Sequence, residues 1–437
     1  MRTTDRWEDH SVDAVVGGTR SARRGAIDVA RVGALGLVVL GHLTLAIIDR
    51  GPDGELRGAN VLALYPGLAW LAMLAPMPVF FAAAGWANST STPRSCAPRL
   101  TVLVGLGAVV VGVWSAASVG ERLVRGDGGV VADGARLATQ PLWFLAVYVP
   151  FAALGSGISR VASRPVVAVG ACFAVLICLD AARFWFGAPE ALGWPGFYLA
   201  WGVPWLVGAW WRLRWQTGSI DERRSGALLA VTGSAVAGGL VLFFGYDPAL
   251  IDAVEGQRSN TTPPGLFTAV AAVVQVGLLM MIAIVLDHVA ARWRTIFDRA
   301  GEMAVAVYAW HLTALALCAA LIAVGVWAPG RFSAGWWMSR PLWFVAVLGL
   351  TVLLAAATHR GRRRQRRSNC PAESSMVRIG LGLASATLGA GIVGLVGPRS
   401  LASATFATAA FVAGWWLLRP VAGTSTAAEA APASTRE

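Results

Sequence analysis

The chain lacks lysine altogether and carries few charged residues of any kind. Charged residues make up 14% of its 437 positions and hydrophobic residues 56%, a balance that excludes an ordinary soluble protein. The net charge of +12 comes wholly from arginine. Arginines grouped in short segments between apolar runs are typical of the cytoplasmic side of a membrane protein. The composition therefore predicts a multi-pass protein of the lipid bilayer, and we expect no nucleic-acid partner.

Cysteine is scarce as well. The five cysteines form no Cys-x-x-Cys pair, and no histidine stands at ligand spacing from them. This pattern predicts neither a disulfide framework nor a metal site. The first apolar run ends without a small-residue cleavage site, so we expect it to be retained as a signal-anchor helix.

Long runs of apolar residues make up most of the sequence. With about 20 apolar residues for one crossing, the chain offers twelve candidate spans. They cover residues 26–48, 61–86, 100–119, 141–157, 166–186, 195–211, 226–244, 264–286, 303–327, 341–357, 377–396 and 400–418.

The arginines divide the segments between these spans into two alternating classes. Every second segment is basic, whereas the others mix few arginines with acids, as in 121–136 and 247–258. This alternation predicts that both termini are cytoplasmic. The expected fold class is all-α, a polytopic transmembrane helix bundle with a ten-span core over 26–358 and a two-span hairpin over 377–418. Residues 1–25 are expected to be a polar N-terminus, 359–376 a basic linker and 419–437 a disordered tail.

The first span contains two ionisable residues on one face. Arg31 and His42 are eleven residues apart, which places them within about 20° of each other around a helix and about 16 Å apart along its axis. Arg31 is expected near one headgroup layer and His42 beyond the middle of the bilayer. An ionisable side chain at that depth predicts a functional site, with a structural hydrogen bond to a neighbouring helix as the alternative.

Four short motifs carry a resemblance to a known family. The first span has the pattern D-x-x-R-x-x-A followed by a Val-rich run and a histidine, and the second has P-x-F-F-x-x-x-G, which contains Phe80. The fourth span contains L-W-F-L with Trp143, and the ninth contains Y-x-x-H ending at His311. With these motifs the chain resembles the acyltransferase 3 family of integral membrane acyl-CoA-dependent O-acyltransferases, over about residues 26–358.

The resemblance implies an activity, a location and partners. It implies transfer of an acyl group, most simply acetyl, from acyl-CoA to a hydroxyl of an envelope carbohydrate, glycolipid or glycoside at the bacterial inner membrane. No metal is expected. A neutral buried histidine can take the hydroxyl proton, which makes His42 the candidate base. His311 either orients His42 or the acceptor, or makes a structural hydrogen bond.

The same resemblance assigns binding roles. Arg31, beside Asp28, is expected to hold a phosphate or pantetheine region of acyl-CoA, although an Arg31–Asp28 pair anchoring the helix end is the alternative. Arg94 and Arg99 are candidates for the coenzyme phosphates, but they depart from the R-x-x-R pair of many members because they stand five apart with Pro98 between them. The substrate cavity is expected between the first, second, fourth and ninth spans, lined by Phe80 and Trp143.

A secondary transporter is the alternative from another class. Residues 141–147, PLWFLAV, are similar to residues 341–347, PLWFVAV, and two parallel six-span halves would suit a transporter. However, tryptophans at helix ends also arise from the aromatic belt of any membrane protein. No long central loop separates two halves, so an acyltransferase is the favoured interpretation.

Overall fold

The computed structural model describes residues 23–50, 56–65, 75–126, 129–248, 250, 259–326, 329–366 and 375–419. The expected N-terminal segment up to residue 22 and the expected tail from residue 420 lie outside this part. The described chain forms α1 (Gly25–Leu45), β1 (Ala46–Arg50), β2 (Leu56–Asn60), α2 (Val61–Leu64), α3 (Met77–Asn88), α4 (Pro93–Arg125), α5 (Val130–Thr139), η2 (Gln140–Trp143), α6 (Phe144–Ala153), α7 (Gly155–Ala162), α8 (Pro165–Trp185), η3 (Glu190–Gly193), α9 (Gly196–Gln216), α10 (Glu222–Phe244), α11 (Leu266–Arg292), α12 (Arg294–Ala323), α13 (Ala334–Arg366), α14 (Met376–Leu395) and α15 (Leu401–Leu418).

The all-α polytopic bundle expected from the sequence is confirmed. Within the described residues, nine helices are long and apolar enough to cross a membrane, and ten if one bent pair is counted as a span. Twelve spans were expected. The difference lies at α9, whose 21 residues include five tryptophans and two arginines, and at the expected second span, part of which falls outside the described residues.

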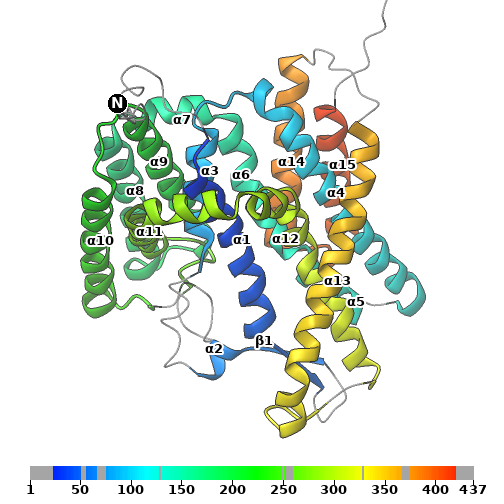
Figure 1. The fold of residues 1–437 in the computed structure, drawn as a ribbon. Coiled ribbons are helices and arrows are strands. Elements are labelled where there is room, and N and C mark those ends of the chain that lie inside the picture. The colour runs from blue at the N-terminus through cyan, green and yellow to red at the C-terminus, as the bar shows by residue number, and fades with distance from the viewer. Residues whose placement is uncertain are drawn as a thin grey trace, which may run out of the picture.

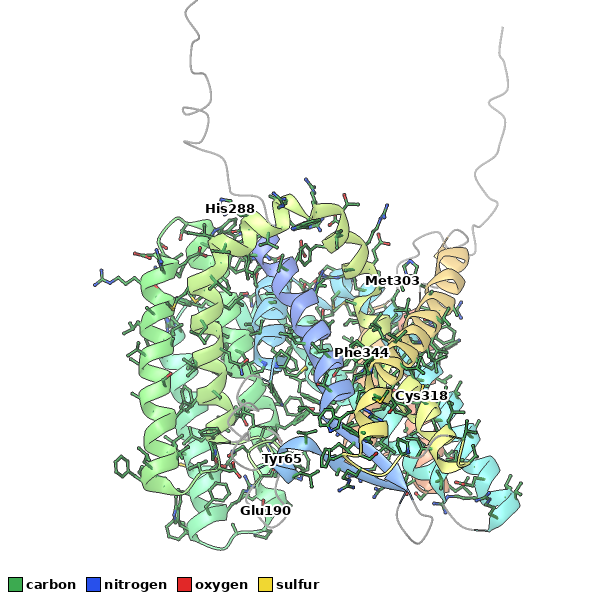
Figure 2. The ribbon with its side chains drawn as sticks, turned by 60° about the horizontal axis from the view of Figure 1, so that its bottom comes forward. Tyr65, Glu190, His288, Met303, Cys318 and Phe344 are labelled. Carbon is green, nitrogen blue, oxygen red and sulfur yellow. The ribbon has the colours of Figure 1, made fainter. Side chains whose placement is uncertain are left out.

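Helix α1 occupies the middle of the bundle. Figure 1 shows it with α8, α9, α10 and α11 on one side and α4, α13, α14 and α15 on the other. It packs against α3, α11 and α12. Figure 2 shows His288 and Met303 at the end where the chain passes from α11 into α12, with Tyr65 and Glu190 toward the opposite end. The helix with the two ionisable residues is therefore flanked by protein on several sides.

The expected fourth span is broken. Residues Val130–Ala153 and Gly155–Ala162 meet at an angle of 76°, and Pro150 lies inside α6 just before the break. At the bend the backbone approaches that of α3 closely, because a Cβ built on Gly155 would lie 1.9 Å from the carbonyl oxygen of Asn88. Only glycine fits such a contact.

The first helix ends earlier than expected. It stops at Leu45 instead of continuing to residue 48, and Ala46–Arg50 pairs with Leu56–Asn60 as an antiparallel hairpin. Ile47 and Ile48 are β-branched and favour a strand over a helix.

The two PLWF segments also differ in structure, since the first begins in η2 whereas the second lies inside α13. The short sequence repeat is thus not a structural repeat.

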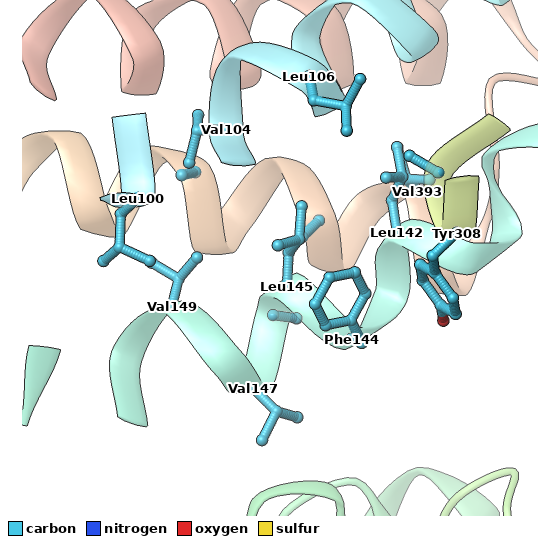
Figure 3. Packing of buried hydrophobic residues seen from close by; sticks show 14 of the residues in the cluster. Leu100, Val104, Leu106, Leu142, Phe144, Leu145, Val147, Val149, Tyr308 and Val393 are labelled. Atoms are coloured by element: carbon cyan, nitrogen blue, oxygen red, sulfur yellow. The ribbon is translucent and has the colours of Figure 1, made fainter. Parts of the chain in front are cut away.

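The C-terminal hairpin is part of the main core. Helices α14 and α15 pack against α4, and α14 also packs against α6 and η2. Figure 3 shows Val393 of α14 near Leu142 of η2 in the apolar cluster that α4 and α6 also line. Small residues permit this packing, because a Cβ on Gly414 of α15 would meet Ala386 and Gly382 of α14 at about 3 Å. Such contacts are typical of close helix pairs in membranes. The expected linker after residue 358 continues α13 as helix to Arg366.

Within the described residues, the arginine-rich segments expected on one side of the membrane lie at one end of the bundle, where Ser159 donates to the carbonyl oxygen of Ser89, Arg212 donates to that of Trp86, and His359 lies 3.9 Å from Glu302. A buried guanidinium, that of Arg24, ties α1 to α10 and α11 there. It makes a bidentate pair with Glu222 and a 2.9 Å hydrogen bond to Asp287, and its side chain is only 5% exposed. Burial alone lowers the pKa of Arg24, but the bonds and charges of both carboxylates outweigh burial and raise the pKa above its ordinary value.

We predict that Arg24→Met destabilises the bundle far more than Arg23→Met. The first change leaves Glu222 and Asp287 without their buried partner, at a cost of about 3–5 kcal/mol. The side chain of Arg23 is 64% exposed, and loss of its surface pairs is worth less than about 1 kcal/mol. Thermal unfolding of the detergent-purified protein measures both, and equal midpoints for the two variants would refute this role of Arg24.

Candidate functional site

Helix α1 directs both of its unusual residues toward α12. Arg31 lies beside Gly301, where a Cβ would come within 3.7 Å of its Nη2 atom, and His42 contacts His311 further along the same helix. Because α1 is continuous from Gly25 to Leu45, the eleven-residue spacing keeps the two side chains about 16 Å apart along the axis. The common face expected from the sequence is present in the structure.

Two histidines from distant parts of the chain form a hydrogen-bonded pair. The Nδ1 atom of His42 lies 2.9 Å from the Nε2 atom of His311, and the rings stack with centroids 5.0 Å apart. The Nδ1 atom of His311 lies 2.5 Å from the backbone carbonyl oxygen of Tyr308. His311 is fully buried, whereas His42 is partly buried.

This geometry fixes where the protons sit when both rings are neutral. The carbonyl oxygen of Tyr308 can only accept, so Nδ1 of His311 carries a hydrogen and its Nε2 is bare. Nδ1 of His42 must then donate to that bare nitrogen. We accordingly assign the one unprotonated ring nitrogen that is still free to accept a proton to Nε2 of His42. A bare imidazole nitrogen in this setting can accept a proton from a hydroxyl group.

Aromatic rings from α3, α6 and α12 pack beside the histidine pair. The ring of Phe80 is 97% buried and lies 5.8 Å from that of Phe144, which meets Tyr308 edge-on at 5.1 Å. The Tyr308 hydroxyl donates to the carbonyl oxygen of Pro141 at 3.1 Å, and its ring lies 5.5 Å from that of His311. Figure 3 shows Phe144 and Tyr308 in this cluster. The structure thus brings together the first, second, fourth and ninth expected spans.

Trp143 lies on the other side of this aromatic cluster. Its ring contacts Phe81, Phe197 and Trp201 at centroid distances of 5.3–6.3 Å. A Cβ on Gly394 of α14 would lie 2.9 Å from the Cβ of Trp143, so the C-terminal hairpin supports this residue directly. Trp143 makes no ring contact with the histidine pair within the described part of the chain.

The guanidinium of Arg31 is exposed enough to bind a ligand, and it also pairs weakly with a neighbouring carboxylate. Its side chain is 40% exposed, and among the described residues it pairs only with Asp28, at 3.4 Å, near the long limit for a hydrogen bond. Asp28 also accepts a 2.8 Å bond from Arg23. Asp28 is therefore satisfied without Arg31, and the guanidinium of Arg31 keeps most of its donors available.

Arg94 and Arg99, which fall between the expected second and third spans, lie on a helix. Thr92 caps α4 in a capping box with Ser95, so the helix begins at Pro93. The two arginines stand five positions apart on this helix, which places them about 140° apart around its axis. Both are exposed, and Arg99 donates to Ser91 at 3.1 Å. Among the described residues, no hydrogen bond or ion pair joins either of them to Arg31 or Asp28.

Sequence reasoning missed the role of Tyr308. Tyr308 belongs to the Y-x-x-H motif, but its backbone carbonyl oxygen is what orients His311. A pattern of side chains does not reveal a role of the backbone. Three-residue spacing on a helix, which brings a side chain over the preceding turn, was the available signal. In the part of the chain that the structure covers, no three His, Cys, Asp or Glu side chains are grouped so as to hold a metal ion.

Comparison with known proteins assigns the family. The acyltransferase 3 family model, described as an acyltransferase domain, matches residues 24–360, which include α1, α3, α6 and α12 with all the site residues described above. No curated protein and no solved structure matches the chain. The match covers well over half of the sequence, and the chain therefore belongs to the acyltransferase 3 family.

Proposed function

We propose that this membrane acyltransferase moves an acyl group, most simply acetyl, from acyl-CoA to a hydroxyl of an envelope carbohydrate, glycolipid or glycoside. The observation that carries the proposal is the hydrogen-bonded histidine pair with the Tyr308 carbonyl behind it, from which we assign a bare Nε2 to His42. A bacterial inner membrane fits this chemistry, since the donor is cytoplasmic and the acceptor belongs to the envelope.

The proposed reaction follows from that bare nitrogen. As the acceptor oxygen attacks the thioester carbonyl carbon, Nε2 of His42 takes the hydroxyl proton. The tetrahedral intermediate then collapses with loss of the carbon–sulfur bond, and the imidazolium returns its proton to the departing thiolate. His311 accepts the hydrogen bond from Nδ1 of His42 throughout, so it holds the ring in the tautomer that the first step requires.

The donor is proposed to bind at the Arg31 end. Arg31 lies at the same end of the bundle as the arginine-rich segments, and its donors are largely free. A guanidinium suits the phosphates of coenzyme A because its planar fork can bind two oxygens at once. Since Arg31 and His42 share the face toward α12, the thioester would reach His42 along that face.

We expect His42→Ala to abolish transfer. Membranes containing the variant, supplied with labelled acetyl-CoA, should pass label to their acceptor pool at least about 100-fold more slowly than wild type, the usual contribution of a general base. His288→Ala is the matched control, because His288 is exposed on α11 and contacts only the carbonyl oxygen of Ile284 among the described residues. Labelling by His42→Ala at the wild-type rate would reject the assigned base.

At His311 we expect a graded series. Glutamine can accept from Nδ1 of His42 through its amide oxygen and donate to the Tyr308 carbonyl, so His311→Gln should stay within roughly tenfold of wild type. Phenylalanine can do neither, and His311→Phe should lose on the order of 100-fold. The transfer rate of folded, purified protein measures the series. Equal losses in the two variants would show that His311 only fills space.

Substitution of Arg31 should discriminate between donors. Arg31→Met is expected to raise the KM for acetyl-CoA roughly 10- to 100-fold, the usual loss for a charge-assisted contact. It should leave the rate with S-acetyl-N-acetylcysteamine, which lacks the phosphates, near that of wild type. Arg23→Met serves as the neighbouring control. If both donors were affected alike, Arg31 would be a structural anchor and not a phosphate ligand.

A further inference from the structure

A second arginine, Arg340, lies within the bundle at the end opposite Arg31. It stands six residues after the start of α13 at Ala334, about 9 Å along the helix. Residues Trp336, Val347, Thr351 and Ala355 on the same helix are at least 95% buried. Arg340 follows their three- and four-residue spacing, so it belongs to the face of α13 that is turned toward the protein.

The opposite face of α13 is the one suited to lipid. Trp337, Met338 and Leu342 are between 59% and 82% exposed. An arginine that serves only to anchor a helix in the headgroups extends from such a face toward water. Arg340 instead is half-buried. Its Cζ atom lies 4.2 Å from the ring centroid of Trp336 and 5.3 Å from that of Trp343.

This cluster contains donors but no acceptor. The Nε atom of Arg340 and the Nε1 atoms of Trp336 and Trp343 are all buried, and none of them has a hydrogen-bond partner among the described residues. No carboxylate within the described ranges pairs with the guanidinium. Arginine and tryptophan side chains cannot accept hydrogen bonds, so they cannot satisfy one another. Buried polar groups are nearly always paired, and a missing group with several acceptor oxygens would satisfy this set.

The donor cluster adjoins the packing around the histidine pair. Trp343 packs against an apolar cluster that includes Leu43 of α1 and Leu312 of α12, the residues that directly follow His42 and His311. Phe344 and Cys318 in Figure 2 mark where α12 and α13 pack in this region. A ligand held at Arg340 would therefore approach the histidines from the end opposite the proposed donor site.

We propose that Arg340, whose guanidinium lies over the rings of Trp336 and Trp343, binds an acidic group, a carboxylate or phosphate, of the acceptor carbohydrate. This inference rests on the proposed function and adds a substrate class to it, namely an acidic or phosphorylated sugar. The guanidinium supplies a planar pair of donors that matches either oxyanion. The two indoles hold its plane in place and strengthen its interaction with the anion by excluding water.

The test is ligand-induced stabilisation of the full-length protein in a neutral sugar detergent. Glucuronate and glucose 6-phosphate should raise the thermal unfolding midpoint in a saturable way, whereas glucose should not. Arg340→Gln should weaken the apparent affinity for both acids at least about tenfold. Arg125→Gln, an exposed arginine at the same end of the bundle, should bind as wild type does. Arg340→Lys keeps the charge without the fork and should give an intermediate affinity.

Three outcomes would overturn the proposal: no saturable shift with either acid, shifts that Arg340→Gln leaves unchanged, or a shift with phosphatidylglycerol but not with the acidic sugars. The last result would make the cluster a lipid-headgroup site. Binding is measured without an acyl donor, so the result stands apart from catalysis. His42→Ala should bind the acidic sugars normally, and it would do so even if His42 proved not to be the base.

Discussion

The hydrogen bond between His42 and His311 is the interaction on which the proposed chemistry depends. It joins α1 to α12 across 269 positions of sequence, and the Tyr308 carbonyl fixes its direction from the far side. A single buried histidine would be free to exchange tautomers, and either nitrogen could then face the substrate. The chain of three groups removes that freedom, as the aspartate does for the histidine of a serine protease triad, and it does so without placing a negative charge in the bilayer.

Several helices hold the two histidines in position. The ring of Tyr308 contacts His311, Phe144 of α6 contacts Tyr308, and Phe80 of α3 contacts Phe144, so a chain of ring contacts links His311 to α6 and α3. The C-terminal hairpin lies beyond the family match but packs into the same core and supports η2 through Gly394. At one end of α1 the buried Arg24 fixes the helix to α10 and α11. Arg31, whose pair with Asp28 is long, and Arg340, which has no carboxylate partner among the described residues, lie toward opposite ends of this supported region, as a donor and an acidic acceptor would require.

Some of this arrangement could be predicted from the sequence because it is local. The common face of Arg31 and His42 follows from the helical period alone, and the all-α class follows from the apolar runs. The partner of His42 could not be derived, because no periodic rule links residues 269 positions apart. The break in the fourth span follows Pro150 and brings Gly155 against Asn88 of α3, a contact that only the tertiary structure reveals. The sequence marked residues 377–418 only as a separate hairpin with almost no ionisable groups, whereas in the structure its small residues allow close packing with the core. Arg340 was missed because an arginine near a helix end usually indicates topology, and only the structure shows that its Nε atom is buried without an acceptor among the described residues.

The proton arrangement of the histidine pair is open to direct measurement. The chain has five histidines, so solid-state ¹⁵N NMR of histidine-labelled protein in bilayers near neutral pH can assign each ring nitrogen. The account predicts that His42 carries its hydrogen on Nδ1 with Nε2 bare, and that a coupling across the hydrogen bond links Nδ1 of His42 to Nε2 of His311. A protonated Nε2 on neutral His42, or the absence of that coupling, would contradict it.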